Sequence, residues 1–226
     1  MAEPLMPGGL RDEIARTLQP VRPLAPSGRR VAVLLPLAGV LLVGVPLVFG
    51  LRYDAARVGT LRLWVGSGLE VGVALAMLAG ALAESVPGRL PAPQRVAARV
   101  ALGLTFMIVL TFVTFLASPT HVPLSREVRY FLTCFRWPFV LGLLPLGVAG
   151  LLLRRGLTTR PALAGLMAGL GAGLLADSSW RLYCEVSDPV HVLPAHAGAV
   201  VALAVTGALG GALLRTRSVP RTPSPE

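Results

Sequence analysis

The sequence predicts an all-α protein, a polytopic transmembrane bundle of about six helices with both termini on the cytoplasmic side. Three observations lead to this expectation: 54% of the 226 residues are hydrophobic and only 14% are charged, the mean hydropathy is +0.70, and long uncharged runs recur. Soluble globular domains carry about 25% charged residues. The composition therefore excludes a soluble domain and leaves little chain for anything outside the membrane.

Six apolar runs reach or approach the roughly 20 residues that cross a bilayer. They lie at 31–51, 63–83, 100–124, 137–153, 161–176 and 191–214. Only the second contains a charged residue, Glu70. We therefore divide the chain into a polar tail at 1–30, a bundle at 31–214 and a C-terminal tail at 215–226. The first run exceeds the roughly 7–15 residues of a signal-peptide core, so we expect it to be a retained span.

The arginines predict the orientation of the spans. All 21 cationic residues are arginine, and with the N-terminus inside, the cytoplasmic side holds 14 of them and the outer side 7. Such a bias toward short loops on one side sets the direction of insertion. We therefore place both termini in the cytoplasm. The net charge of +10 follows from this arginine usage, and we expect no direct binding of nucleic acid.

The N-terminal tail contains one short helix candidate, LRDEIARTLQ, between proline- and glycine-rich stretches. Leu10, Ile14 and Leu18 repeat every fourth residue and form a single apolar stripe. About ten residues make only a marginal helix when isolated. The segment is therefore either a disordered or membrane-surface leader, or a partner-binding helix that uses these three residues as anchors. In the second case Arg11 and Arg22 would supply charged contacts at its rim.

Small residues recur every fourth position in two of the spans, which predicts close helix packing. The second span has Gly68, Gly72, Ala76 and Gly80, and the fifth has Gly165, Gly169 and Gly173. Gly207 and Gly211 form a weaker pair in the last span. We expect the second and fifth spans at the centre of the bundle.

Two carboxylates lie within spans, Glu70 and Asp177. Asp177 precedes Arg181 by four residues, so a local ion pair on one helix face is the simpler interpretation. The alternative is a small ion or solute transporter that uses both carboxylates, although the two halves show no evident internal repeat. The motifs of phosphate-binding loops, zinc proteases and nucleophile elbows are missing from the sequence, so we do not expect an enzyme.

The two cysteines, Cys134 and Cys184, fall near the outer ends of spans and could form a redox pair in an oxidising periplasm. Arg181, about one turn from Cys184, could lower the pKa of that thiol. His191 and His196 lie on the same side, so the four side chains would suffice for zinc or a similar metal. Because Pro194 separates the histidines, their relative direction stays undetermined. Two inert buried thiols remain the third alternative.

Several stretches resemble the NrsF-type family of six-span inner-membrane anti-sigma factors. They are the leader LRDEIARTLQPVRPLAPSGRR, the LTCFRW around Cys134, RRGLTTRPALAGLMAGLGAGLLA, and YCEVSDPVHVLPAHAG around Cys184. The family often has His-Cys-Pro at the second cysteine, where this chain has Tyr183, Cys184 and Glu185. The histidine at position 191 replaces a frequent aromatic residue, which suggests a histidine-bearing branch of the family.

The resemblance implies a function that fits the predicted topology. The N-terminal segment would hold an extracytoplasmic-function sigma factor at the membrane and keep it from RNA polymerase. Envelope, redox, metal or light stress would change the state of Cys134 and Cys184 outside, and the sigma factor would then be released. This requires a bundle with two alternative packings.

Overall fold

The computed structural model describes residues 24–85, 93–122, 124–156 and 158–217, together with Gly9, Asp12, Glu13 and Arg16. Within these residues the secondary structure is helical and contains no strand. The expected partner-binding residues of the tail lie outside the described residues; they are Leu10, Arg11, Ile14, Leu18 and Arg22.

Six helical segments of the described chain are long and apolar enough to cross a membrane, as the sequence predicted. The first comprises α2 (Ser27–Val31), η1 (Ala32–Leu34) and α3 (Leu35–Phe49). The next four are α5 (Thr60–Ala83), α6 (Pro93–Ala117), α7 (Glu127–Arg154) and α8 (Pro161–Trp180). The sixth comprises α9 (Pro189–Val192), the π-helical η3 (Leu193–Ala197) and α10 (Gly198–Arg217). The connections contain α4 (Ala55–Val58) and η2 (Leu124–Arg126).

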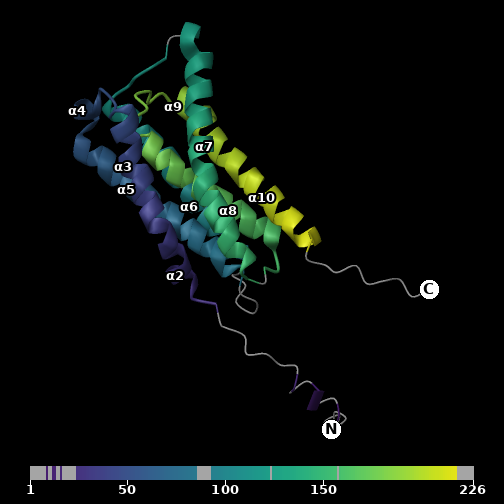
Figure 1. The fold of residues 1–226 in the computed structure, drawn as a ribbon. Helices are drawn as coiled ribbons and strands as arrows, with labels where there is room; N and C mark the ends of the chain where they lie inside the picture. Colours follow the sequence, from purple (N-terminus) through teal and green to yellow (C-terminus); the bar gives the residue numbers. More distant parts are fainter. Residues whose placement is uncertain are drawn as a thin grey trace.

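Several helix ends differ from the apolar runs, most clearly those on either side of the connection between α6 and α7. α6 ends at Ala117 rather than near residue 124, and α7 begins at Glu127, ten residues before the run at 137–153. Charged residues in the first turns of α7 do not interrupt its backbone hydrogen bonds. Hydropathy therefore locates the apolar part of this helix but not its first residue. As a result α7 extends beyond its neighbours at one end of the bundle (Figure 1).

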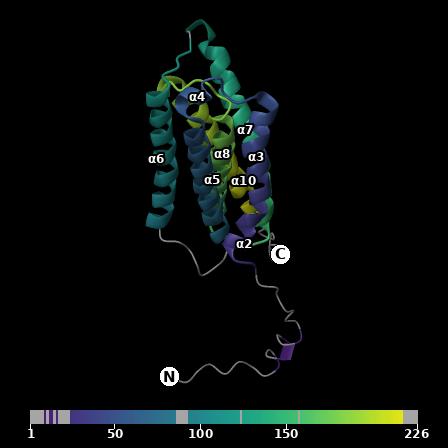
Figure 2. The same ribbon diagram turned by 90° about the vertical axis from the view of Figure 1, so that its left-hand side faces the viewer.

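Helix α8 lies at the centre of the bundle. Of the residues in its apolar stretch, 83% are buried, whereas the share is 50% in α5 and 22% in each of the spans of α3, α6 and α7. It packs mainly against α10, α5 and α7, while α6 lies at the periphery beside α5 (Figure 2). A helix that is apolar all round is expected in such a position.

The small-residue face predicted for the fifth span forms the closest contact in the bundle. A side-chain carbon at Gly165 would overlap the carbonyl group of Gly207, and one at Gly169 would overlap the backbone of Leu203 and Ala204. Gly211 lies equally close to the carbonyl of Pro161. The backbones of α8 and α10 therefore touch directly, which only glycine allows at these positions.

We predicted that four small residues of the second span pack against another helix, and this prediction is wrong for three of them. Gly68, Gly72 and Ala76 are exposed on the outside of the bundle, and only Gly80 is buried. The face of α5 that meets α8 is shifted, so that Glu70 is fully buried with Ala74 and Leu78. Exposing a carboxylate to lipid costs a few kcal/mol at mid-depth, which favours the rotation of the helix that buries Glu70.

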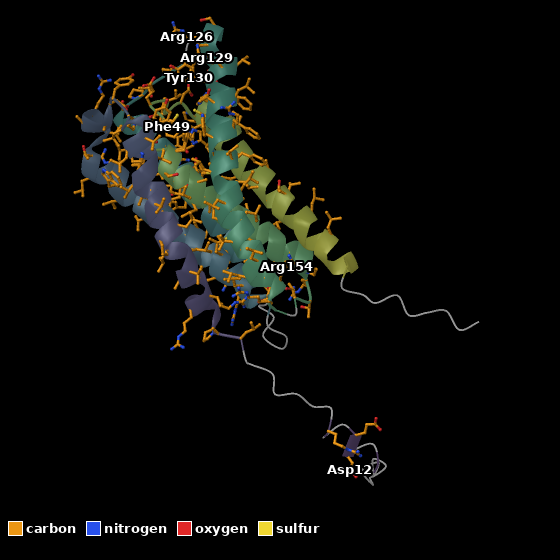
Figure 3. The ribbon with its side chains drawn as sticks, in the orientation of Figure 1. Asp12, Phe49, Arg126, Arg129, Tyr130 and Arg154 are labelled. Carbon is orange, nitrogen blue, oxygen red and sulfur yellow. The ribbon has the colours of Figure 1, made fainter. Side chains whose placement is uncertain are left out.

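The two ends of the bundle carry different structures. α2 begins and α10 ends at the same end, whereas α4, α9 and the first turns of α7 lie at the other (Figure 1). Arg126, Arg129 and Tyr130 lie far from Arg154 along the length of α7 (Figure 3). The predicted cysteine site belongs to the end opposite α2.

Candidate sensing site

Four buried side chains come together at the end of the bundle opposite α2. Cys134 lies in the second turn of α7, and Cys184 follows the end of α8, where its N–H donates to the Trp180 carbonyl oxygen over 2.8 Å. Asp188 caps α9 by accepting from the Val190 N–H over 3.0 Å. His191 lies in α9 and His196 in η3.

The π-helical turn decides the direction of the two histidines, which the sequence left undetermined. An α-helix rotates side chains five residues apart by about 140°, and the wider π-helical turn that contains His196 reduces this angle. The ring centroids of His191 and His196 are 6.4 Å apart. The proline between them lacks an N–H donor, and such a residue is compatible with this local widening.

The four side chains form a compact cluster. The two sulfur atoms are 3.5 Å apart, and one ligand atom of each of Cys134, Cys184, His191 and His196 lies within 4.8 Å of the others. All four residues are at most 5% exposed. The structure thus assembles the set that the sequence suggested for a metal or redox site.

Each histidine is held by a carboxylate. The Nδ1 atom of His191 lies 2.8 Å from Glu127 Oε1, and that of His196 lies 2.6 Å from Asp177 Oδ1. An ionised carboxylate only accepts, so both Nδ1 atoms donate, and in a neutral imidazole Nε2 then carries the lone pair that can bind a metal. Both Nε2 atoms are buried without a hydrogen-bond partner within the described chain. This is the arrangement of metal-binding histidines, in which a second group fixes the tautomer.

The ion pair predicted within α8 is present but belongs to a larger network. Arg181 Nε lies 2.7 Å from Asp177 Oδ2 and 3.5 Å from Glu70 Oε2. Arg181 also donates through Nη2 to Thr111 Oγ1 over 3.1 Å. Glu70 and Asp177, which the transporter alternative used as a pair, therefore meet at a guanidinium group. The sequence did not indicate that α5, α6 and α8 contribute to one network.

The expectation that Arg181 activates Cys184 is not met. The guanidinium is engaged by the two carboxylates, while the hydrogen bond with Cys134 and burial raise the pKa of the Cys184 thiol to about 11. A thiol with this pKa is protonated at neutral pH.

A second arginine fixes the segment that carries Cys184. Arg52 donates to Asp54 through Nε over 2.5 Å, and through Nη2 to the Glu185 carbonyl oxygen and Ser187 Oγ over 3.0 and 2.9 Å. Burial alone would raise the pKa of Asp54, but hydrogen bonds from Arg52 and Ser118 and the Arg52 charge lower it below the usual value. Hydrogen bonds from Arg52 therefore hold the segment that follows Cys184 against the end of the first span.

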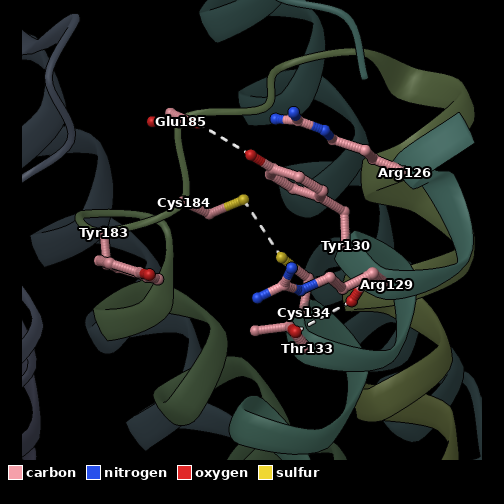
Figure 4. A pocket seen from close by; sticks show the side chains of 8 residues that line it. All are labelled: Arg126, Arg129, Tyr130, Thr133, Cys134, Tyr183, Cys184 and Glu185. Carbon is pink, nitrogen blue, oxygen red and sulfur yellow. Dashed lines mark hydrogen bonds between the residues drawn. The ribbon is translucent and has the colours of Figure 1, made fainter. Parts of the chain in front are cut away.

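A cavity of about 520 Å³ opens beside the sulfurs, between the first turns of α7 and the chain that follows α8 (Figure 4). Its lining includes both cysteines together with Arg126, Arg129 and Glu185. The cavity thus borders the cysteine side of the cluster at this end of the bundle.

Arg30, at the opposite end, is a residue of interest that sequence reasoning missed. It is only 6% exposed and donates to the Leu82 carbonyl oxygen, Ser85 Oγ and the Leu152 carbonyl oxygen over 3.2, 2.8 and 2.6 Å. The sequence shows it only as one of two adjacent arginines before an apolar run. Its role depends on contacts with residues 52–122 positions away, which no local pattern reveals.

Comparison with known proteins places the chain in one family. No curated protein and no solved structure matches it. Residues 14–215 match the family model NrsF, described as negative regulator of sigma F, which covers nearly the whole bundle and both cysteine positions. Because the match spans most of the chain, which also has six helices apolar enough to cross a membrane, the chain belongs to the NrsF family of negative regulators of sigma F.

Proposed function

We propose that this chain is an anti-sigma factor of a bacterial inner membrane that retains an extracytoplasmic-function sigma factor through its N-terminal segment. Leu10, Ile14 and Leu18 would bind a groove on the sigma factor, with Arg11 and Arg22 at the rim. Both termini would lie in the cytoplasm, following the distribution of arginines. We propose neither a catalytic activity nor direct contact with nucleic acid. The family match over residues 14–215 is the observation that carries this proposal.

The stimulus would act on the cluster formed by Cys134, Cys184, His191 and His196. In the proposed orientation this cluster lies at the outer side of the membrane. Two thiolates and two imidazole nitrogens are a common tetrahedral ligand set for Zn²⁺. Zinc bond lengths imply separations of about 3.3–3.8 Å between ligand atoms, so a cluster within 4.8 Å needs a contraction of about 1 Å. The donor atoms and their supporting carboxylates therefore fit zinc or a similar ion.

Oxidation is the other chemical change that the cluster supports. The sulfurs are 3.5 Å apart, and a disulfide requires about 2.05 Å. The two states exclude each other, because sulfur atoms joined in a disulfide no longer bind a metal as thiolates. A change between them would displace α7 relative to the chain after α8.

A route to the cytoplasmic end runs along α7. This helix carries Cys134 near its first turns and the Leu152 carbonyl at its last turn, where Arg30 binds. Arg30 belongs to the first helical segment after the N-terminal tail. Even a hundredfold loss of sigma affinity requires only about 2.7 kcal/mol of coupling, comparable to a few hydrogen bonds of a buried guanidinium.

A membrane pull-down tests the retention of the sigma factor. Deletion of residues 1–25, or Leu10→Ala/Ile14→Ala/Leu18→Ala, should abolish co-purification of the sigma factor. Deletion of residues 218–226 serves as the control, because it shortens the other cytoplasmic tail, and should leave retention intact. Unchanged retention after the N-terminal deletion would refute the proposal.

The cysteines are tested with a sigma-dependent reporter. Cys134→Ser and Cys184→Ser should give the same altered response to oxidants or metals, because a pair that acts as one unit is lost with either member. Normal induction in both variants would exclude the sensing role while leaving sigma retention unaffected.

A further inference from the structure

The cavity beside the cysteines is larger than a metal ion requires. Its volume is about 520 Å³, whereas a water molecule takes roughly 30 Å³ of liquid volume. Sites for small organic molecules are typically about 300–1,000 Å³. The size of the cavity thus suits a solute of many atoms that reaches the sulfurs directly.

The charges around the cavity favour an anion. Arg126 and Arg129 are exposed residues of η2 and the first turn of α7, and both line the cavity. The single lining carboxylate, Glu185, accepts from the Tyr130 hydroxyl over 3.5 Å. Figure 4 shows the guanidinium group of Arg129 beside Cys134 and that of Arg126 on the other side of Tyr130. Two positive charges against one negative charge attract anionic solutes and repel cationic ones.

The sulfurs supply a reaction for such a solute. Cys134 and Cys184 both line the cavity, and they are close enough for a second sulfur to complete an exchange begun at the first. We propose that the cavity is a binding site for small anionic disulfides, which oxidise the Cys134–Cys184 pair by thiol–disulfide exchange. This inference rests on the proposed sensing role of the two cysteines and names the class of oxidant.

The exchange proceeds in two balanced steps. The thiolate of one cysteine attacks a sulfur of the solute disulfide, the solute S–S bond breaks, and one solute thiolate leaves while a mixed disulfide forms. The second cysteine, as thiolate, then attacks the protein sulfur of the mixed disulfide and expels the other solute thiolate. The two cysteines are oxidised and the solute disulfide is reduced to two thiols, which take up the two protons the cysteines lost.

Charge selectivity in purified protein tests this assignment. Full-length, reduced and chelator-treated protein in detergent is mixed with oxidised glutathione, which is anionic, with the neutral bis(hydroxyethyl) disulfide, or with the cationic cystamine. Formation of the Cys134–Cys184 disulfide is followed by mass spectrometry after alkylation. Each rate is divided by that of a free dithiol with the same reagent, which removes the intrinsic reactivity of the reagent.

We expect the normalised rate for the anionic disulfide to exceed that for the cationic one by about tenfold or more at low salt, with the preference shrinking as salt is raised. Arg126→Gln/Arg129→Gln should reduce the preference to near unity. The matched control is Arg57→Gln/Arg62→Gln, which removes the same charge from exposed residues outside the cavity and should keep the preference.

Equal normalised rates for the three reagents in the unaltered protein, or an anion preference that survives Arg126→Gln/Arg129→Gln, would overturn the assignment. Cys134→Ser and Cys184→Ser identify the attacking sulfur, because only the variant that retains it accumulates the mixed disulfide. None of these rates depends on sigma binding, so the cavity assignment can fail while the pull-down succeeds, and the reverse.

Discussion

At the scale of single residues, two carboxylates decide which nitrogen of each histidine faces the sulfurs. Glu127 and Asp177 accept from Nδ1 of His191 and His196, which leaves Nε2 of both rings directed into the cluster. Such supporting groups orient metal ligands and raise their basicity. The sequence identified the four candidate ligands, but it did not connect Glu127 with His191 across 64 positions.

The supporting carboxylate predicts a defined loss of metal affinity. Glu127→Gln should weaken Zn²⁺ binding by about 10- to 100-fold, because a neutral amide no longer holds His191 with an ionised acceptor. Competition with a chromophoric chelator measures this affinity. Glu185→Gln is the control, since Glu185 lines the cavity but bonds to Tyr130 rather than to a histidine. Equal affinities for the two variants would contradict the supporting role of Glu127.

At the scale of helices, direct backbone contact and buried charge determine the packing. α8 meets α10 through glycines, whereas α5 turns Glu70 toward α8 and leaves Gly68 and Gly72 exposed. The same fourfold spacing thus marks a contact in one helix and a lipid-facing surface in another. Small residues at every fourth position identify a helix face that permits close packing. The polar residues of the helix decide which face turns toward the interior of the bundle.

Two glycine substitutions separate these cases. Gly169→Val should destabilise the bundle by about 3 kcal/mol or more, because its side chain would overlap the backbone of α10, which cannot move aside. Gly72→Val should have little effect, since nothing within 4 Å faces that position. Thermal unfolding in detergent compares them. Similar melting temperatures for the two variants would show that the α8–α10 contact is looser than described.

The ends of α5 and α7 give a third prediction. Arg30→Gln should destabilise the protein by about 2–3 kcal/mol, because Arg30 donates hydrogen bonds to the Leu82 carbonyl of α5, to Ser85 just after α5, and to the Leu152 carbonyl of α7. It should also weaken sigma retention in the membrane pull-down if α7 transmits the signal. Arg29→Gln is the control, as Arg29 is exposed. A destabilised protein that retains the sigma factor fully would restrict Arg30 to a structural role.

At the scale of the whole molecule, the sensing cluster and the start of the first span lie at opposite ends of the bundle (Figures 1 and 3). In the proposed mechanism a signal would therefore travel the length of a helix. The proposed orientation, with the cluster outside, predicts which positions are accessible to an impermeant reagent.

In a Cys134→Ser/Cys184→Ser background, Tyr53→Cys should react with an impermeant maleimide on intact spheroplasts, because Tyr53 is 71% exposed at the cluster end. Arg155→Cys, exposed at the other end, should react only after the membrane is opened. The reverse pattern would invert the proposed topology and remove the outside-to-inside signal.

Composition and hydropathy sufficed for the class of protein and its six spans, because lipid requires each crossing to be a long apolar helix with internal backbone hydrogen bonding. The packing face of α8 could also be predicted from the sequence, because the spacing of its glycines depends on a single helix. The tertiary structure decided everything that depends on how one helix faces another. It set the rotation of α5 around Glu70, the π-turn that aligns His191 with His196, the network around Arg181, and the contacts of Arg30. These arrangements follow from satisfying buried charges with partners distant in sequence, and the residues near each group in the chain do not specify those partners.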